Sequence, residues 1–463
     1  MAFHKIGLAL LGLAFLAGCA VGPDYRKPVV TTPDQWQIKQ SGKLSELQDW
    51  WARFEDPSLN TLLVSAQKES TSLAKATAAI EKARASRMSA ESGFGPTLDA
   101  SADATSSGSL KHNGGVTHKL GTLLDASWEL DLFGKTRRSM ESADALIAAR
   151  EADWHDARIS LAAEVVADYV DYRACRIKQK YYEEQVESQT KTTELTRIAA
   201  NAGFTAAADA RLAEASEAST RATARAQKTE CEVLVKTLVA LTNIEETSLR
   251  TVLRSEVAGL PEPIGLRVDS VPANLLRQRP DVVAAERALA SASALIGVAE
   301  AARWPTLTLS GSVGISKTQG TSLSAPWSFG PALKLPIFDG GSISASIKSA
   351  KADYDSALAT YQQTIRDAVK EVEQSLTRLD NVSEREEALS KSAEGYRAYL
   401  IATEQNWRAG GVSQLDLETA RRSAISAEVS LLELQQNRLS YWIALYKAVG
   451  GGWQAEMTKG DAK

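Results

Sequence analysis

The sequence lacks three features that would place it in a common class. It has three cysteines in 463 residues, too few for a scaffold held together by several disulfides. Its 53 basic and 57 acidic residues give a net charge of −4, without the basic excess of a nucleic-acid-binding surface. After the N-terminus, no run of about 18 consecutive apolar residues occurs. If the later chain crosses a membrane, it must therefore do so as strands of a closed barrel.

Histidine is also scarce, and no catalytic motif accompanies it. The four histidines, at positions 4, 112, 118 and 155, form no His-Glu-x-x-His pattern. Two of them, His112 and His118, lie in the segment KHNGGVTHKL, whose composition favours a solvated loop over a metal site. Ser65 and Lys68 match a Ser-x-x-Lys pattern, but its partner motifs are missing. We therefore expect no enzyme activity, no metal site, no cofactor and no nucleic-acid partner.

What the sequence does contain begins with a secretion signal. Lys5 precedes the apolar run Ile6–Ala17, which is too short to span a bilayer and fits a signal-peptide core. The following LAGC resembles the lipobox of bacterial lipoproteins; the alternative is a plain secretory signal that happens to include a cysteine. We predict a signal peptide over residues 1–18 and acylation, such as palmitoylation, of Cys19. Ala20 replaces the Asp that would resemble an inner-membrane retention signal, which favours the outer membrane.

Four segments alternate apolar and polar residues, the pattern of a strand with two unlike faces. They are residues 97–105, 122–133, 306–317 and 327–338. In the clearest one, Ala126, Trp128, Leu130 and Leu132 alternate with polar residues. Each segment has about the length of a tilted membrane strand, ~9–11 residues.

The chain also repeats itself. FGPTLDAS, starting at Phe94, resembles RWPTLTLS, starting at Arg303, and a constant shift of 207 residues pairs Ala143 with Ala350. Self-similarity over such a period indicates a tandem duplication. The predicted parts are an N-terminal extension (19–58), a first repeat (59–243), a linker (244–270), a second repeat (271–450) and a C-terminal tail (451–463).

Each repeat predicts three helices around its strand pair. These are a helix of moderate length (about 60–92 and 272–302), a very long helix (about 135–200 and 342–407) and a returning helix (about 207–243 and 413–449). A helix of the longest kind would extend about 100 Å, which no globular core accommodates. The predicted fold class is therefore mainly α with β, with long helical hairpins that pack along one another like a coiled coil.

Four strands cannot close a barrel on their own, because bare edges in lipid cost several kcal/mol per unsatisfied group. Two copies would give eight strands, a barrel filled by its own side chains, whereas three copies would give twelve strands and a lumen. The charged residues expected to face the lumen are Asp99, Asp103, Asp125, Glu129, Asp131 and Lys334. Their mainly acidic character favours cations.

Aromatic residues lie where the predicted strands meet helices. Phe94, Phe133, Trp304 and Phe338 hold these positions, which is typical of an aromatic belt at one membrane interface. In the alternative, a soluble β-sandwich rim, the same aromatics would form a core.

Together these features resemble the TolC-like outer-membrane factor family, specifically its NodT- and OprM-like lipoprotein branch. The resemblance rests on the lipobox with GCAVGPDYRKP, on the duplicated strand–strand–long-helix plan and on the turns AGFTAAAD and AGGVSQLD. It implies a homotrimer with a 12-stranded transmembrane barrel in the outer membrane of a Gram-negative bacterium and an α-helical periplasmic tunnel. The implied partners are outer-membrane lipid, a periplasmic adaptor (membrane fusion) protein and an inner-membrane pump of the RND type.

The resemblance also implies a periplasmic gate at the helical turns that contain Gly203 and Gly410. Asp209 and Asp416 match positions where carboxylates gather near the family's constriction, and Trp407 matches an aromatic of the same turn. Two plainer interpretations stay open. Ser413-Gln-Leu-Asp416 fits a capping box, and Trp407 fits ordinary helix packing.

Cys175 and Cys231 lie 28 residues before and 28 residues after Gly203. On an antiparallel helical hairpin they would face each other, and the periplasm is oxidising. We predict a disulfide between them; the alternative is two buried free thiols.

The function that the resemblance implies is a passive outer-membrane duct that exports drugs or other toxic compounds in a tripartite efflux system, and such export contributes to antibiotic resistance. Two alternatives remain at this point. One is the outer-membrane duct of a type I protein secretion system. The other is a lipid-anchored periplasmic coiled coil without a pore.

Overall fold

A computed structural model describes residues 20–30, 50–108, 116–254, 259–261 and 279–453. The predicted signal peptide, Cys19, His112 and much of the linker lie outside these residues. The chain forms two compact units, each assembled from separate stretches of sequence. The first contains the described residues within 1–30, 76–153 and 281–364, and the second contains the described residues within 31–75, 154–280 and 365–463.

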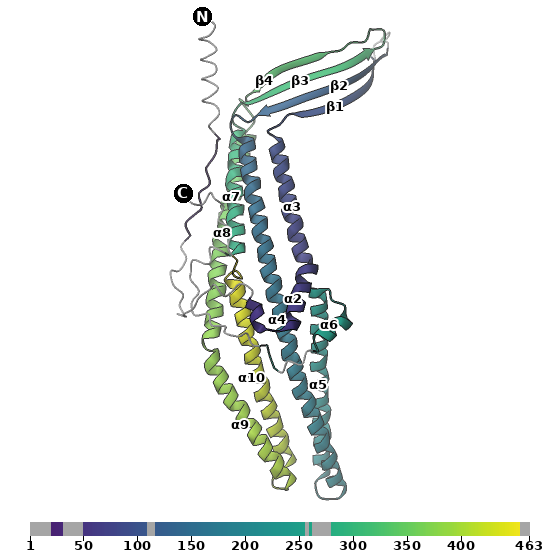
Figure 1. Cartoon of the computed structure of the whole chain (residues 1–463), viewed down its shortest axis with the longest axis vertical. Helices are drawn as coiled ribbons and strands as arrows, with labels where there is room; N and C mark the ends of the chain where they lie inside the picture. Colours follow the sequence, from purple (N-terminus) through teal and green to yellow (C-terminus); the bar gives the residue numbers. More distant parts are fainter. Residues whose placement is uncertain (1–19, 31–49, 109–115, 255–258, 262–278, 454–463) are drawn as a thin grey trace. The chain divides into compact units, whose positions relative to one another are not determined.

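The first unit contains one antiparallel sheet of four strands in the order β1-β2-β3-β4 (Figure 1). The strands are β1 (Thr97–Ser107), β2 (Thr117–Leu130), β3 (Thr306–Thr318) and β4 (Trp327–Lys334). Pairing of β2 with β3 joins the strand pairs of the two repeats into one sheet.

Two strands end earlier than the alternation predicts. Strand β2 stops at Leu130, because the next residue, Asp131, caps the helix that follows. Strand β4 stops at Lys334. Pro336 follows closely after β4 and has no N–H to donate to a ladder. The apolar residues 335–338 therefore lie outside the sheet.

The helices follow the predicted plan with breaks. They are η2 (Trp50–Phe54), α2 (Pro57–Glu69), α3 (Thr71–Ser92), α4 (Lys135–Asn201), α5 (Ala207–Thr242), α6 (Glu246–Val252), α7 (Pro280–Ala301), α8 (Ser342–Asp380), α9 (Val382–Arg408) and α10 (Gln414–Ala448). Helix α4 is one continuous helix of 67 residues, as predicted. The short helix α6 lies in the predicted linker and was not expected.

The second long helix is not continuous, contrary to prediction. It breaks into α8 and α9 at Asn381, whose backbone has φ −96° and ψ 4°. The shift of 207 residues places Ala174 of α4 at the equivalent position. Alanine is the best helix former, whereas asparagine bonds readily to nearby backbone and favours helix ends. The first moderate helix breaks similarly at Ser70, whose hydroxyl accepts the Leu73 N–H at 3.2 Å.

A buried polar cluster fixes the start of α2 in the second unit. Asp56 precedes Pro57 and accepts the Ser58 N–H at 2.9 Å, an N-cap followed by proline at the first helical position. The other carboxylate oxygen of Asp56 accepts the Tyr169 hydroxyl at 2.6 Å, and Tyr169 in turn accepts from Arg173 at 3.1 Å. The cluster ties the start of α2 to α4.

Among the described helices, α7 meets the length and hydropathy expected of a membrane span. Half of its most apolar window is buried inside the protein. Since core helices meet the same criteria, this composition does not by itself indicate a span.

Candidate functional site

One face of the sheet is polar from strand to strand. Directly opposed residues of antiparallel strands point to the same face. Asp99 pairs with Asp125, Asp125 with Ser312, and Ser312 with Ser328, which forms one polar row across all four strands. The hydroxyls of Ser312 and Ser328 lie 2.8 Å apart. A neighbouring row consists of Thr97, Ser127, Ser310 and Gly330.

The remaining predicted lumen residues are held in different ways. Asp103 opposes Gly121, and a Cβ at Gly121 would lie 2.8 Å from the Asp103 carboxylate, so the missing side chain makes room for the acid. Glu129 forms an ion pair with Lys135 at 3.2 Å. Lys334 ends β4 opposite Thr306.

Asp131 does not lie on a strand, which corrects the sequence prediction. Its carboxylate accepts the backbone N–H groups of Thr136 at 3.0 Å and Arg137 at 3.1 Å, and also the Arg137 Nε–H at 3.1 Å. The negative charge thus satisfies the first turn of α4, where free N–H groups and the helix dipole favour an anion. The alternating pattern continued through Asp131, but the competing helix cap determines its position.

The opposite face of the sheet is apolar and exposed. One row contains Ala100, Leu124, Val313 and Trp327, and the next contains Leu98, Ala126, Gly311 and Phe329. Trp327 is 77% exposed and Phe329 is 75% exposed. A continuous apolar face of this kind indicates contact with lipid or with another protein surface rather than with water.

The four junction aromatics lie between strands and helices, as the sequence predicts. Phe133, which follows β2, stacks on Trp304, which precedes β3, with ring centroids 5.1 Å apart and planes at 17°. Phe94 lies between α3 and β1, and Phe338 lies between β4 and α8. Phe94, Trp304 and Phe338 are exposed.

The segment that follows Cys19 is bound to the first unit by backbone contacts. The Val21 N–H donates to the Phe133 carbonyl at 3.1 Å. Gly22, with φ +94°, lies against Gly297 of α7, where a Cβ on Gly22 would be 2.4 Å from the Gly297 Cα. Gly134 makes a similar contact, since a Cβ there would lie 2.6 Å from the Ala20 Cβ. Glycine at these positions permits the close approach.

Two side chains complete this attachment. The Arg138 guanidinium, which is buried, donates to the Val21 carbonyl at 3.2 Å and to the Asp24 carboxylate at 2.8 Å. The Tyr25 hydroxyl donates to Glu286 Oε1 at 2.6 Å. Sequence reasoning did not predict these contacts, although the motif GCAVGPDYRKP contains the residues that make them.

The two helical turns share one backbone motif. Gly203 and Gly410 have φ +80° and φ +76°, the left-handed conformation that glycine adopts without strain. The Phe204 N–H bonds to the Ala199 carbonyl at 2.9 Å, and the Gly411 N–H bonds to the Asn406 carbonyl at 2.8 Å. These are Schellman caps at equivalent positions of the two repeats.

The carboxylates after these turns have different partners. Asp416 forms the predicted capping box with Ser413, and these hydrogen bonds lower the pKa of Asp416. In the first repeat Ala206 replaces the capping serine, and Asp209 instead accepts the Thr205 hydroxyl at 2.7 Å. Trp407 is half-buried near the end of α9, where its carbonyl accepts the Gly410 N–H.

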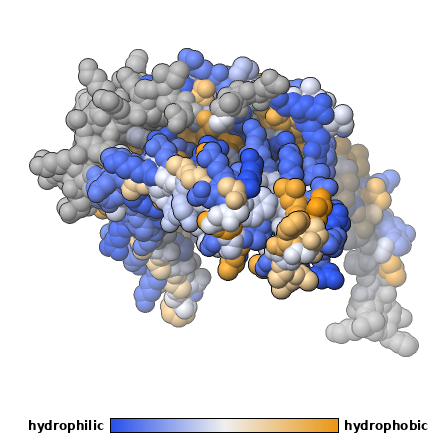
Figure 2. Space-filling model, turned by 90° about the horizontal axis from the view of Figure 1, so that it is seen from below, coloured by the Kyte–Doolittle hydropathy of each residue, from blue (hydrophilic) through white to orange (hydrophobic). Residues whose placement is uncertain are grey.

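Hydrophobic side chains are exposed at these turns. Phe204 is 88% exposed and Leu415 is 56% exposed. The view from the hairpin ends shows a mainly hydrophilic surface with separate hydrophobic patches (Figure 2).

Cys175 of α4 and Cys231 of α5 are joined by a disulfide with a Cα–Cα distance of 5.6 Å. Both residues are buried. The bond links the two arms of the first helical hairpin within the second unit, at the level that their equal spacing from Gly203 predicts.

A buried arginine connects the hairpins and was missed by sequence reasoning. Arg421 of α10 lies 3.1 Å from Glu418 and 3.0 Å from Glu404 of α9, and it donates to the Thr192 hydroxyl of α4 at 2.7 Å. Burial raises the pKa of Glu418, and the Arg421 charge opposes that rise. No spacing rule relates residues 229 positions apart, so only the fold brings Thr192 and Arg421 together.

Comparison with known proteins places these features in a family. The family model described as outer membrane efflux protein matches residues 62–243 and 271–451, which is most of the chain and corresponds to both repeats. The chain belongs to the outer membrane efflux protein family. The resemblance seen in the sequence is thereby confirmed, and so is a mainly α fold with a β part.

Relatives in this family cover nearly the full chain. Nodulation protein T of Rhizobium leguminosarum bv. viciae is 32% identical over 460 residues, spanning 97% of this chain and 94% of the relative. The cation efflux system protein CusC of Escherichia coli K12 is 28% identical over 453 residues, spanning 94% and 97%.

Solved structures of outer-membrane channels show the same fold. The outer-membrane channel OprN superposes with a TM-score of 0.82 at 31% identity, covering 94% of this chain and all of that one. The MtrE outer membrane channel of Neisseria gonorrhoeae, in its open state, gives a TM-score of 0.76 at 29% identity, with coverage of 95% and 100%.

Proposed function

We propose that this outer membrane efflux protein is the outer-membrane duct of a tripartite efflux system and works as a homotrimer. The observation that carries the proposal is the four-stranded sheet with one polar and one exposed apolar face. Such a sheet suits lipid on one side and a water-filled lumen on the other.

The outer strands of the sheet require further copies. β1 and β4 each pair with one neighbour, so each offers an open edge. In a bilayer the unpaired N–H and C=O groups of these edges need partners, because lipid supplies none. Edge-to-edge pairing of three chains gives twelve strands and a lumen, whereas two chains give a barrel that side chains fill.

Acylated Cys19 anchors the duct in the outer membrane. The bound segment after it starts at Ala20, beside Gly134 and the stacked pair of Phe133 and Trp304. Aromatic rings prefer the membrane–water interface. The attachment of this segment therefore holds the acyl chains of Cys19 at the membrane–water interface.

The helical hairpins form the periplasmic tunnel, and their turns meet a periplasmic adaptor that links the duct to an inner-membrane pump of the RND type. The exposed Phe204 and Leu415 supply apolar contacts at these turns. Asp209 and Asp416 line the gate, and Trp407 packs beside it. The duct itself is passive and catalyses no reaction, because energy comes from the pump.

Efflux is favoured over protein secretion as the transport task. Relatives are described as cation or antibiotic efflux components. The acids on the polar face, including Asp99, Asp103 and Asp125, favour cationic small molecules in the lumen. A lipid-anchored coiled coil without a pore would not account for the exposed apolar face of the sheet.

Adjacent substitutions on β3 test the proposal. Ser312 lies on the polar face and Val313 on the apolar face. Val313→Lys places a charge in lipid, which costs about 2–4 kcal/mol near the midplane, whereas Ser312→Lys places it in water. In a deletion strain that has become sensitive to cationic drugs, we expect S312K to restore resistance and V313K to fail to reach the outer membrane. Equal insertion of both variants would contradict the proposed faces, and unchanged drug sensitivity on deletion would contradict the efflux role.

A further inference from the structure

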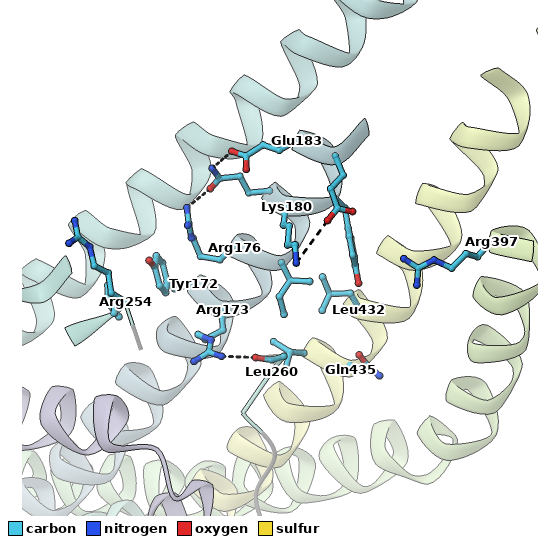
Figure 3. A pocket seen from close by; sticks show the side chains of 16 residues that line it. Tyr172, Arg173, Arg176, Lys180, Glu183, Arg254, Leu260, Arg397, Leu432 and Gln435 are labelled. Atoms are coloured by element: carbon cyan, nitrogen blue, oxygen red, sulfur yellow. Dashed lines mark hydrogen bonds and ion pairs between the residues drawn. The ribbon is translucent and has the colours of Figure 1, made fainter. Parts of the chain in front are cut away.

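A cavity of about 720 Å³ opens within the second unit (Figure 3). Residues of α4 between Tyr172 and Glu184 form one wall, and Leu253, Arg254, Gly259 and Leu260 form another. Helices α9 and α10 close the remaining side through Arg397, Leu432 and Gln435. Its volume lies in the range of small-molecule sites, about 300–1,000 Å³. Nothing in the proposed duct function uses this cavity.

The charges around the cavity are mainly positive. Five cationic side chains line it, and two acidic ones: Arg173, Arg176, Lys180, Arg254 and Arg397 against Glu183 and Glu184. The local excess of three positive charges contrasts with the chain's net charge of −4. Clustered cations in a hollow raise the local concentration of anions.

Two of these cations have no acidic partner in the described part of the chain. The Arg176 guanidinium donates a hydrogen bond to the neutral side chain of Gln179 at 2.8 Å. The Gln179 amide N–H in turn donates to the Glu183 carboxylate at 2.6 Å. The Arg254 side chain makes no ion pair among the described residues. Arg173, by contrast, is held by hydrogen bonds to the Gly259 carbonyl at 2.8 Å and to the Tyr169 hydroxyl at 3.1 Å.

Arg176 and Arg254 also border a second hollow. This smaller cavity, of about 130 Å³, shares Arg176, Arg254 and Tyr172 with the first. Arg250 and Glu232 also line this smaller cavity, and they form an ion pair with each other. The guanidinium groups of Arg176 and Arg254, which have no acidic partner among the described residues, therefore line both cavities, and Tyr172 lines both with them.

We propose that this cavity is a binding site for a compact anion that carries two or more carboxylate or phosphate groups. A guanidinium presents a planar fork of donors that matches either group, and two such forks without acidic partners suit two anionic groups. Tyr172 and Leu253 contact the less polar part of the ligand. The described residues contain no group of His, Cys, Asp or Glu that could hold a metal ion, and the cations would repel one.

The experiment uses the full, detergent-purified protein and titration calorimetry with two probes, inorganic pyrophosphate and citrate. Binding of pyrophosphate alone assigns the site to phosphates, citrate alone to carboxylates, and both to the shared chemistry. We expect Arg176→Gln and Arg254→Gln each to weaken binding about tenfold or more, because each removes a charge-assisted contact.

The matched control is Arg225→Gln, which removes an exposed arginine on α5 that does not line the cavity. It should bind like the wild type. If neither probe binds at millimolar concentration, the proposal is overturned. Equal weakening of binding by R225Q and R254Q would also overturn it, because binding would then depend only on the net charge of the protein. Circular dichroism and particle mass establish that each variant is folded before titration. Because the readout is binding, its failure leaves the duct function untouched.

Discussion

Gly22 and Gly297 lie in backbone contact, so close that a Cβ on Gly22 would lie 2.4 Å from the Gly297 Cα. A Cβ on Gly297 would lie 2.9 Å from the Val21 carbonyl oxygen and 2.8 Å from the Arg138 Cγ. The contact joins the segment after the lipidation signal to α7. It explains why a glycine interrupts an otherwise Ala-rich helix.

The first prediction concerns this contact. Gly297→Ala should destabilise the protein by about 1–3 kcal/mol through overpacking and should loosen residues 20–30. Limited trypsin digestion after Arg26 would report the loosening, together with the melting temperature. The matched control is Gly395→Ala in α9, where a new Cβ meets nothing within 4 Å. That change should be neutral or stabilising by up to about 1 kcal/mol. Equal behaviour of the two variants would show that the contact is unimportant.

The second prediction concerns the disulfide. Reduction, or the change Cys175→Ser with Cys231→Ser, should lower stability by about 4 kcal/mol, the amount expected for a bond that closes a loop of this length. Alkylation followed by mass spectrometry checks the bond itself. We expect both cysteines to resist alkylation in unfolded, unreduced protein and to react after reduction. Alkylation without reductant would show free thiols.

A third prediction follows from Asp168. Burial, with added repulsion from Glu164 and Asp171, raises its pKa to about 6. An ordinary Asp titrates near 3.9 in the unfolded chain, so the folded protein binds extra protons between about pH 4 and pH 6. Its contribution to stability is therefore greatest below pH 4 and is lost as the pH rises through 6.

Asp168→Asn removes the charge and should raise stability at pH 7.5 by about 1 kcal/mol, a value reduced because the side chain is partly exposed to solvent. The gain should vanish at pH 4. Thermal melting at the two pH values measures it, and Asp353→Asn, on the exposed surface of α8, serves as the control. A gain that is the same at both pH values would contradict the assignment.

The fourth prediction separates the two interpretations of Asp416. Ser413→Ala removes the cap and should speed hydrogen exchange in the first turn of α10 while leaving the carboxylate in place. Asp416→Asn removes the charge. If Asp416 lines the gate, D416N should reduce block of the pore by Mg²⁺ in planar bilayers and S413A should not. Identical conductance of D416N and wild type would leave only the capping role.

The sequence was sufficient for the features that depend on local pattern. Alternation located all four strands, and the shift of 207 residues related the helical turns at Gly203 and Gly410. Local competition changed the details, since Asp131 prefers the helix cap and Asn381 breaks a helix that Ala174 continues. The Arg421 cluster, the contacts of Gly22 and the cationic cavity depend on residues brought together by the fold, so no local pattern reveals them.

The central claim is that three chains complete one barrel, since each chain supplies a sheet with two open edges. Native mass spectrometry of the detergent-purified protein tests it most directly. The account predicts a particle of three acylated chains that stays associated at high dilution. A stable monomer or dimer would contradict it.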